Sequence, residues 1–141
     1  MRIGQWRLAT AAFAGFLWLA ILWDLPRSGR AQPAATGKNL FDRRCGGCHA
    51  LDGDREGPRL GDVYGRTAGS VNSFEYSDAL KKSGITWNAE TLEKWLIDPE
   101  RLVPNNNMDF HVERADERRD IIAYLKANSA REGVATGEPV R

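Results

Sequence analysis

The most regular apolar pattern of the chain lies near its C-terminus. When this segment is wound at about 3.6 residues per turn, its apolar side chains share one face: Ile121, Ile122, Tyr124 and Leu125. Acidic residues open the segment and a lysine lies in its last turn, which is the arrangement that the helix dipole favours. The pattern predicts an amphipathic helix over residues 116–128.

A second apolar stripe precedes this one. Leu92, Trp95 and Leu96 follow the spacing i, i+3, i+4, which places them on one face of a helix. A proline at position 99 is expected to end that helix, because its ring fits poorly in a helix interior. The stripe therefore predicts a helix over residues 88–98.

The remaining segments predict one further helix and a long loop. Residues 37–48 are helix-like, with Leu40 and Phe41 as apolar contacts. Residues 53–83 are rich in Gly, Asp, Ser and Asn and show little periodicity, which predicts loop. A loop of this length is unusual in a compact domain unless it packs on a bound group. No convincing strand pattern is present, so the chain is predicted to be all-α, with about three main helices plus loops.

The N-terminal segment has the features of an export element. Two arginines precede an uncharged apolar run over residues 8–23, and small residues follow it. The run is shorter than the roughly 20 residues that span a bilayer, but Trp6 and Trp23 bracket it as interfacial anchors do. Residues 1–31 are therefore predicted to be either a cleaved signal peptide or a membrane anchor acting through residues 3–23. Both alternatives place the rest of the chain in the periplasm, facing away from the cytoplasm.

The rest of the chain is predicted to contain one domain. Residues 32–36 are expected to be a linker, residues 37–128 the domain, and residues 129–141 a polar, solvated tail. The chain has 20 basic and 19 acidic side chains, of which 16 and 18 lie in residues 32–141. This near balance gives no indication of nucleic-acid binding. A domain of this size buries only a modest apolar core, so an enclosed cofactor would supply much of its interior.

The two cysteines of the chain are close together and are followed by a histidine, in the motif Cys45-Gly46-Gly47-Cys48-His49. C-x-x-C-H is the haem-attachment pattern, in which two thiols add to the vinyl groups of one haem and the imidazole binds its iron. A thioredoxin-like pair would need a βαβ setting, and a structural zinc site would need a second pair of ligands. A disulfide between the two cysteines is the ordinary alternative. The motif predicts one covalent haem c.

The second iron ligand is predicted from the methionine content. Met1 lies in the export element, so Met108 is the only thioether of the domain. It lies in an irregular polar stretch, where a methionine has little value for core packing. His111 is the rival ligand, and casual packing of Met108 under a loop is the structural alternative. Ligation by His49 and Met108 would favour Fe(II), raise the reduction potential and close both axial positions, which suits electron transfer.

With these residues in place, residues 37–128 resemble class I cytochrome c, specifically its mitochondrial-like bacterial branch. Gly37 and Phe41 match the first-helix side of a helix contact in that family. Tyr124 and Leu125 match the last-helix side of the same contact. The resemblance implies a small class I cytochrome c fold, wrapped around one covalently attached haem, and a monomer.

The resemblance also implies which residues surround the haem. In Gly57-Pro58-Arg59-Leu60, the carbonyl of Pro58 would accept the ring N–H of the axial histidine and strengthen its other nitrogen as a donor. Arg66, Tyr76 and Trp87 would donate hydrogen bonds or charge to haem propionates, which are otherwise costly to bury. Each of the three has an ordinary alternative, as a surface arginine, a half-buried tyrosine and a core tryptophan.

Several positions depart from the family pattern. Asn105 stands where glycine is usual, and asparagine tolerates the left-handed backbone region better than most residues. Asn106 replaces a hydroxyl residue and is expected to keep its hydrogen bond inside the pocket. Trp95 replaces a tyrosine near the methionine sulfur, so a phenol-to-sulfur hydrogen bond is not implied. Leu80 replaces an asparagine and is expected to make the pocket drier. The lysines of the haem edge are largely missing, and Glu100 stands in place of one of them.

These observations predict a monohaem c-type cytochrome that carries single electrons in a periplasmic respiratory or photosynthetic chain. Its donor would be a quinol:cytochrome c reductase-type complex, and its acceptor a terminal oxidase or another reductase. A haem sensor or a tethered subunit of a larger respiratory complex is the alternative. A peroxidase-like enzyme is a weaker alternative, because the sequence offers no distal His/Arg pair for that chemistry.

The attachment motif leads to a direct test. Thioether bonds survive unfolding, so the denatured protein is expected to keep its haem through acid-acetone extraction. The variant Cys48→Ala is expected to yield little stable holoprotein. Complete loss of haem from the extracted wild-type protein, followed by its absorption, would show that the attachment prediction is wrong.

Overall fold

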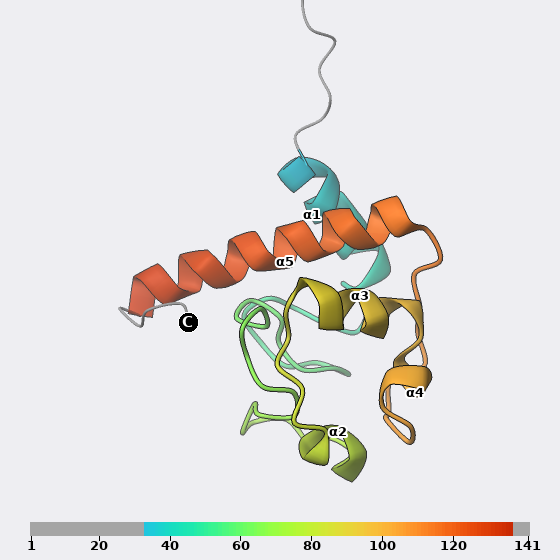
Figure 1. Ribbon diagram of the computed structural model, residues 1–141. Helices are drawn as coiled ribbons and strands as arrows, with labels where there is room; N and C mark the ends of the chain where they lie inside the picture. The colour runs from blue at the N-terminus through green and yellow to red at the C-terminus, as the bar shows by residue number, and fades with distance from the viewer. Residues whose placement is uncertain (1–32, 137–141) are drawn as a thin grey trace, which may run out of the picture.

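The computed structural model describes residues 33–136, which form five α-helices and no β-strand (Figure 1). The helices are α1 (Pro33–Arg44), α2 (Asp78–Lys82), α3 (Ala89–Ile97), α4 (Pro99–Leu102) and α5 (Ala115–Thr136). The prediction of an all-α chain is confirmed. None of the helices in this part of the chain has the length and apolar character needed to span a membrane. The predicted export element, residues 1–31, lies outside the described residues.

The first and last helices pack against each other, and this contact organises the fold (Figure 1). At Gly37 the two backbones come so close that an added Cβ would lie 2.8 Å from the Cβ of Tyr124 and would also clash with the carbonyl of Asp120. One turn later, the rings of Phe41 and Tyr124 pack with their centroids 5.6 Å apart. Glycine is therefore required at position 37 by space rather than by backbone conformation.

Helix α3 is bounded by hydrogen bonds that its sequence supplies. The side chain of Asn88 accepts from the backbone N–H groups of Glu90 and Thr91, at 2.9 and 3.0 Å. The hydroxyl of Thr91 accepts in return from the N–H of Asn88 at 2.8 Å, which completes a capping box. Pro99 follows α3 as predicted, but it also occupies the first turn of α4, where its missing N–H costs nothing.

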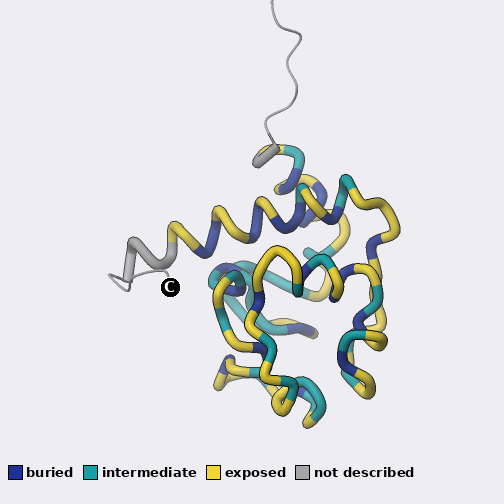
Figure 2. The backbone as a smooth tube through the Cα atoms, in the orientation of Figure 1, coloured by how far each residue is buried: buried dark blue, intermediate teal, exposed yellow. Residues whose placement is uncertain are grey.

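The apolar core lies between α1, α3 and α5 and continues into the long loop (Figure 2). Ile121 is fully buried at its centre. All the apolar positions that the sequence pattern placed on the inner faces of α3 and α5 are buried. The buried cluster comprises Leu40, Phe41, Val63, Ala68, Trp87, Leu92, Trp95, Leu96, Val103, Val112, Ile121, Ile122, Tyr124 and Leu125.

The element boundaries differ from the sequence expectation at both ends of the domain. Residues 33–36, expected in a linker, form the first turn of α1. Helix α5 continues to Thr136, through the first part of the expected tail. Ser129 explains part of this extension, because its buried hydroxyl accepts from the N–H of Tyr64 at 3.0 Å and lies 3.0 Å from the carbonyl of Gly61. Tyr64 and Gly61 belong to the long loop, so no local sequence pattern near Ser129 predicts these hydrogen bonds.

The close approach of α1 and α5 predicts an unusual effect of Gly37→Ala. In most helix interiors, replacing glycine by alanine stabilises by about 0.5–1 kcal/mol. Here the methyl group has no room, so the free energy of unfolding is expected to fall by about 1–3 kcal/mol. Guanidinium denaturation of the holoprotein measures the change. Gly53→Ala is the control, because nothing lies within 4 Å of its added Cβ. Equal stability of the two variants would contradict the prediction.

Candidate cofactor site

The C-x-x-C-H motif continues directly from α1 as a compact turn. The N–H of Cys45 donates to the carbonyl of Phe41 at 2.8 Å, and the N–H of His49 donates to the carbonyl of Cys45 at 2.8 Å. The turn therefore holds both thiols and the imidazole in a fixed order at the end of the helix. Residues 45–48 lie beyond the end of α1, although the sequence pattern placed them in the helix.

The two thiols are free in this structure, and they lie in different surroundings. Cys48 is exposed, whereas Cys45 is partly buried against the apolar core. Burial raises the pKa of the Cys45 thiol to about 11, although Arg44 opposes the shift. Redox-active cysteine pairs depend on a lowered thiol pKa. The surroundings of Cys45 therefore disfavour the thioredoxin-like alternative.

The imidazole of His49 has its orientation set by one hydrogen bond. Its Nδ1 lies 2.7 Å from the carbonyl oxygen of Pro58, as the family resemblance implied. A carbonyl only accepts, so Nδ1 carries the proton and Nε2 keeps its lone pair. Burial lowers the pKa of His49, while the bond to Pro58 opposes the shift. A neutral ring with a free Nε2 lone pair is the form that binds a metal.

Gly57 allows the His49 ring to reach this position. An added Cβ at Gly57 would lie 2.6 Å from Nδ1 and 2.8 Å from Nε2 of the ring. The backbone of Gly57 also returns to the motif, because its N–H donates to the carbonyl of Cys48 at 2.9 Å. In the sequence, Gly57 stands out only as part of the motif Gly57-Pro58-Arg59-Leu60. Its packing role depends on a ring eight residues away and has no local signature.

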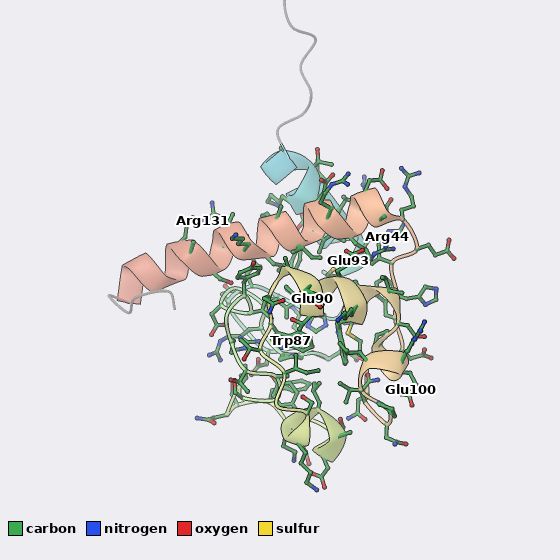
Figure 3. All side chains as sticks on the ribbon, in the orientation of Figure 1. Arg44, Trp87, Glu90, Glu93, Glu100 and Arg131 are labelled. Atoms are coloured by element: carbon green, nitrogen blue, oxygen red, sulfur yellow. The ribbon has the colours of Figure 1, made fainter. Side chains whose placement is uncertain are left out.

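The thioether of Met108 points toward the apolar interior. The indole Nε1 of Trp95 donates to Sδ of Met108 at 3.0 Å. Trp95 is itself buried, and its ring packs edge-to-face on Trp87 at 5.3 Å between centroids. The tyrosine of the family pattern is absent here, but a hydrogen bond to the sulfur is present with a different donor. Figure 3 shows Trp87 beneath α3, on the interior side of that helix.

The loop that carries Met108 has an unusual backbone. Asn105 has a φ of +63°, which lies in the left-handed region and agrees with the presence of glycine at this position in the family pattern. The side-chain oxygen of Asn106 accepts from the N–H of Met108 at 2.7 Å, and its Nδ2 donates to the carbonyl of Val103 at 3.0 Å. The amide of Asn106 thus makes hydrogen bonds to the backbone on both sides of it. His111, the rival ligand, is exposed, and it lines an open cleft of about 320 Å³ beside Met108.

The three residues expected near the propionates are largely buried. The guanidinium of Arg66 pairs with Asp62, and its Nη2 donates to the carbonyl of Arg59 at 3.0 Å. Its Nε is buried and has no hydrogen-bond partner among residues 33–136. Burial raises the pKa of the nearby Tyr76, and the positive charge of Arg66 opposes that shift. A buried N–H that lacks an acceptor, on an otherwise paired guanidinium, fits an additional acceptor group between these side chains.

The pattern of the Cytochrome c family matches residues 34–129. The chain belongs to the cytochrome c family. It is 41% identical over 98 residues to cytochrome c 2.1 of Caenorhabditis elegans, covering 67% of this chain and 88% of that protein. It is 46% identical over 96 residues to cytochrome c of Tetrahymena pyriformis, covering 67% and 87%. The structure of cytochrome cH from Methylobacterium extorquens is similar, with a TM-score of 0.63, 42% identity, and coverage of 67% and 97%.

Membership in the cytochrome c family determines the cofactor and the type of activity. Cytochromes c bind one covalent haem c, and this chain is accordingly an electron-transfer protein rather than an enzyme. The residues present fit that group: two free thiols lie in one turn, His49 keeps a donor nitrogen, and Arg66 has an unsatisfied Nε. When bound, the haem supplies an iron that changes its charge by one electron.

The packing of Gly57 on the His49 ring predicts the effect of Gly57→Ala. The added methyl group must displace the ring or the backbone, and the bond between Nδ1 and the Pro58 carbonyl then weakens. The free energy of unfolding is expected to fall by about 2 kcal/mol or more. Guanidinium denaturation and the visible spectrum of the ferric protein measure the change. A variant as stable as Gly53→Ala, with an unaltered spectrum, would contradict this account of Gly57.

Proposed function

We propose that this cytochrome carries single electrons in a periplasmic chain, from a quinol:cytochrome c reductase-type donor to a terminal oxidase or another reductase. Family membership supports the electron-carrier role. The sequence of residues 1–31 supports export, either as a cleaved signal peptide or as an anchor through residues 3–23. The anchored form would keep the domain near membrane-bound partners, which raises its effective concentration there.

In this proposal, Nε2 of His49 and Sδ of Met108 would hold the iron of the haem. The observation that supports ligation by Met108 is the hydrogen bond from Trp95, because this bond directs the thioether toward the interior rather than toward solvent. A thioether is a soft, neutral donor that favours Fe(II) and so raises the reduction potential. With both axial positions occupied, small substrates do not reach the metal.

The surrounding side chains have separate tasks. The two thiols, of Cys45 and Cys48, hold the cofactor covalently. Pro58 keeps the proton on Nδ1 of the imidazole, so that Nε2 remains a donor. Arg66, Tyr76 and Trp87 offer hydrogen-bond donors and positive charge to carboxylates that would otherwise be costly to bury. Their burial keeps water away, which reduces the reorganisation that accompanies a change of charge.

The test of this function is the variant Met108→Ala. The oxidised wild-type protein is expected to show the weak near-infrared sulfur-to-iron charge-transfer band. The variant should lose that band, have a lower reduction potential, and bind cyanide at the opened iron position. Near-infrared absorption, redox titration and cyanide binding measure the three effects. Retention of the band in the variant would exclude Met108 as the ligand and would favour His111.

A further inference from the structure

The loop that carries Met108 begins with a contact to a carboxylate outside the loop. Glu100, in the first turn of α4, accepts from the backbone N–H of Asn105 at 2.9 and 3.1 Å through its two oxygens. Asn105 is the residue with positive φ, a conformation that side chains other than glycine disfavour. The carboxylate therefore stabilises the strained residue at which the chain turns into the loop.

The same carboxylate reaches Met108 through one further side chain. Nδ2 of Asn106 donates to Glu100 Oε2 at 3.2 Å and to the carbonyl of Val103 at 3.0 Å. Its Oδ1 accepts from the N–H of Met108 at 2.7 Å. A flipped amide would present oxygen to two acceptors and N–H to a donor, so only one orientation is satisfied. Glu100 thus helps to hold Asn106 in the orientation that binds the Met108 backbone.

The far end of the loop is held differently. The buried guanidinium of Arg118 donates from Nη1 to the carbonyls of Val112 and Glu113, at 2.7 and 2.6 Å. Its Nε pairs with Glu93 of α3 at 2.8 Å. This end is anchored by a partly buried ion pair, whereas the end at Asn105 depends on an exposed carboxylate. Opening of the loop is therefore easiest at the Glu100 end, because exposed hydrogen bonds compete with water.

We propose that Glu100 is a positioning residue for Met108, holding the loop closed through Asn105 and Asn106 and so slowing the departure of the thioether from the iron. The proposal rests on the axial ligation proposed above. Trp95 holds the sulfur, and Glu100 holds the backbone that carries it. The family pattern has lysine at this position, and an ammonium group cannot accept either hydrogen bond.

The structure offers a matched control for this proposal. Glu90 is the second residue of α3, as Glu100 is the second residue of α4, and both side chains are exposed (Figure 3). Glu90 binds Lys94 on its own helix at 2.7 Å and has no hydrogen bond to the Met108 loop. Removing either carboxylate takes one negative charge from the first turn of a helix, but only the change at Glu100 affects the loop.

The experiment measures how often the loop opens in the ferric holoprotein. Imidazole reaches the iron only after the thioether leaves, so its binding rate reports loop opening. Loss of the Glu100 contacts in Glu100→Ala is expected to raise that rate about fivefold to tenfold. Glu100→Gln retains one acceptor oxygen and should lie between Glu100→Ala and wild type. Glu90→Ala should stay within about twofold of wild type.

A second measurement separates positioning from general stability. Amide hydrogen exchange at Asn105 and Met108 should accelerate in Glu100→Ala and remain unchanged in Glu90→Ala, because the opening is local. Exchange in α1 and α5 should stay unchanged in Glu100→Ala, because a loss of global stability would accelerate it there as well. Equal imidazole rates and equal exchange in Glu100→Ala and Glu90→Ala would overturn the proposal. Absence of the sulfur-to-iron band in the wild-type protein would instead overturn the axial ligation on which it rests.

Discussion

The packing of α1 on α5 at Gly37 brings two helix backbones into direct contact, with the Cβ of Tyr124 and the carbonyl of Asp120 where a side chain would otherwise stand. Helix α1 passes without interruption into the turn that ends at His49. The contact between α1 and α5, at the two ends of the domain, therefore sets the position of the two thiols and the imidazole. A small chain with a modest core gains a rigid frame for its cofactor in this way.

The interior of the site contains only a few polar groups, and most of them make a defined hydrogen bond. The Pro58 carbonyl accepts from His49, and the Trp95 indole donates to Met108. Arg66 is the exception, because its buried Nε has no partner among the described residues. The guanidinium is paired with Asp62, but a buried N–H without an acceptor still costs folding free energy. An acceptor on the cofactor would remove that cost, which would couple folding to cofactor binding through a hydrogen bond as well as through covalent attachment.

The sequence was informative where chemistry or periodicity is local. It identified the attachment motif and the long stripes of α3 and α5, because each depends on spacing within a few residues. The role of the Pro58 carbonyl was implied only by the resemblance to class I cytochrome c. Helices α2 and α4 are too short to show a period, and they went unpredicted. The Trp95 bond to sulfur joins residues far apart in sequence, and it depends on how α3 faces the Met108 loop. Such contacts arise from tertiary packing, and no local pattern in the sequence reveals them.

The bond from Trp95 also has a stereochemical consequence. The sulfur of Met108 carries two different carbon groups, so its two lone pairs are mirror-related rather than equivalent. The indole N–H engages one of them from a direction that α3 fixes, since an indole cannot rotate its proton as a hydroxyl does. A metal that bound the other lone pair would make the sulfur a stereocentre. The fold of the protein, rather than the metal, would then set its handedness.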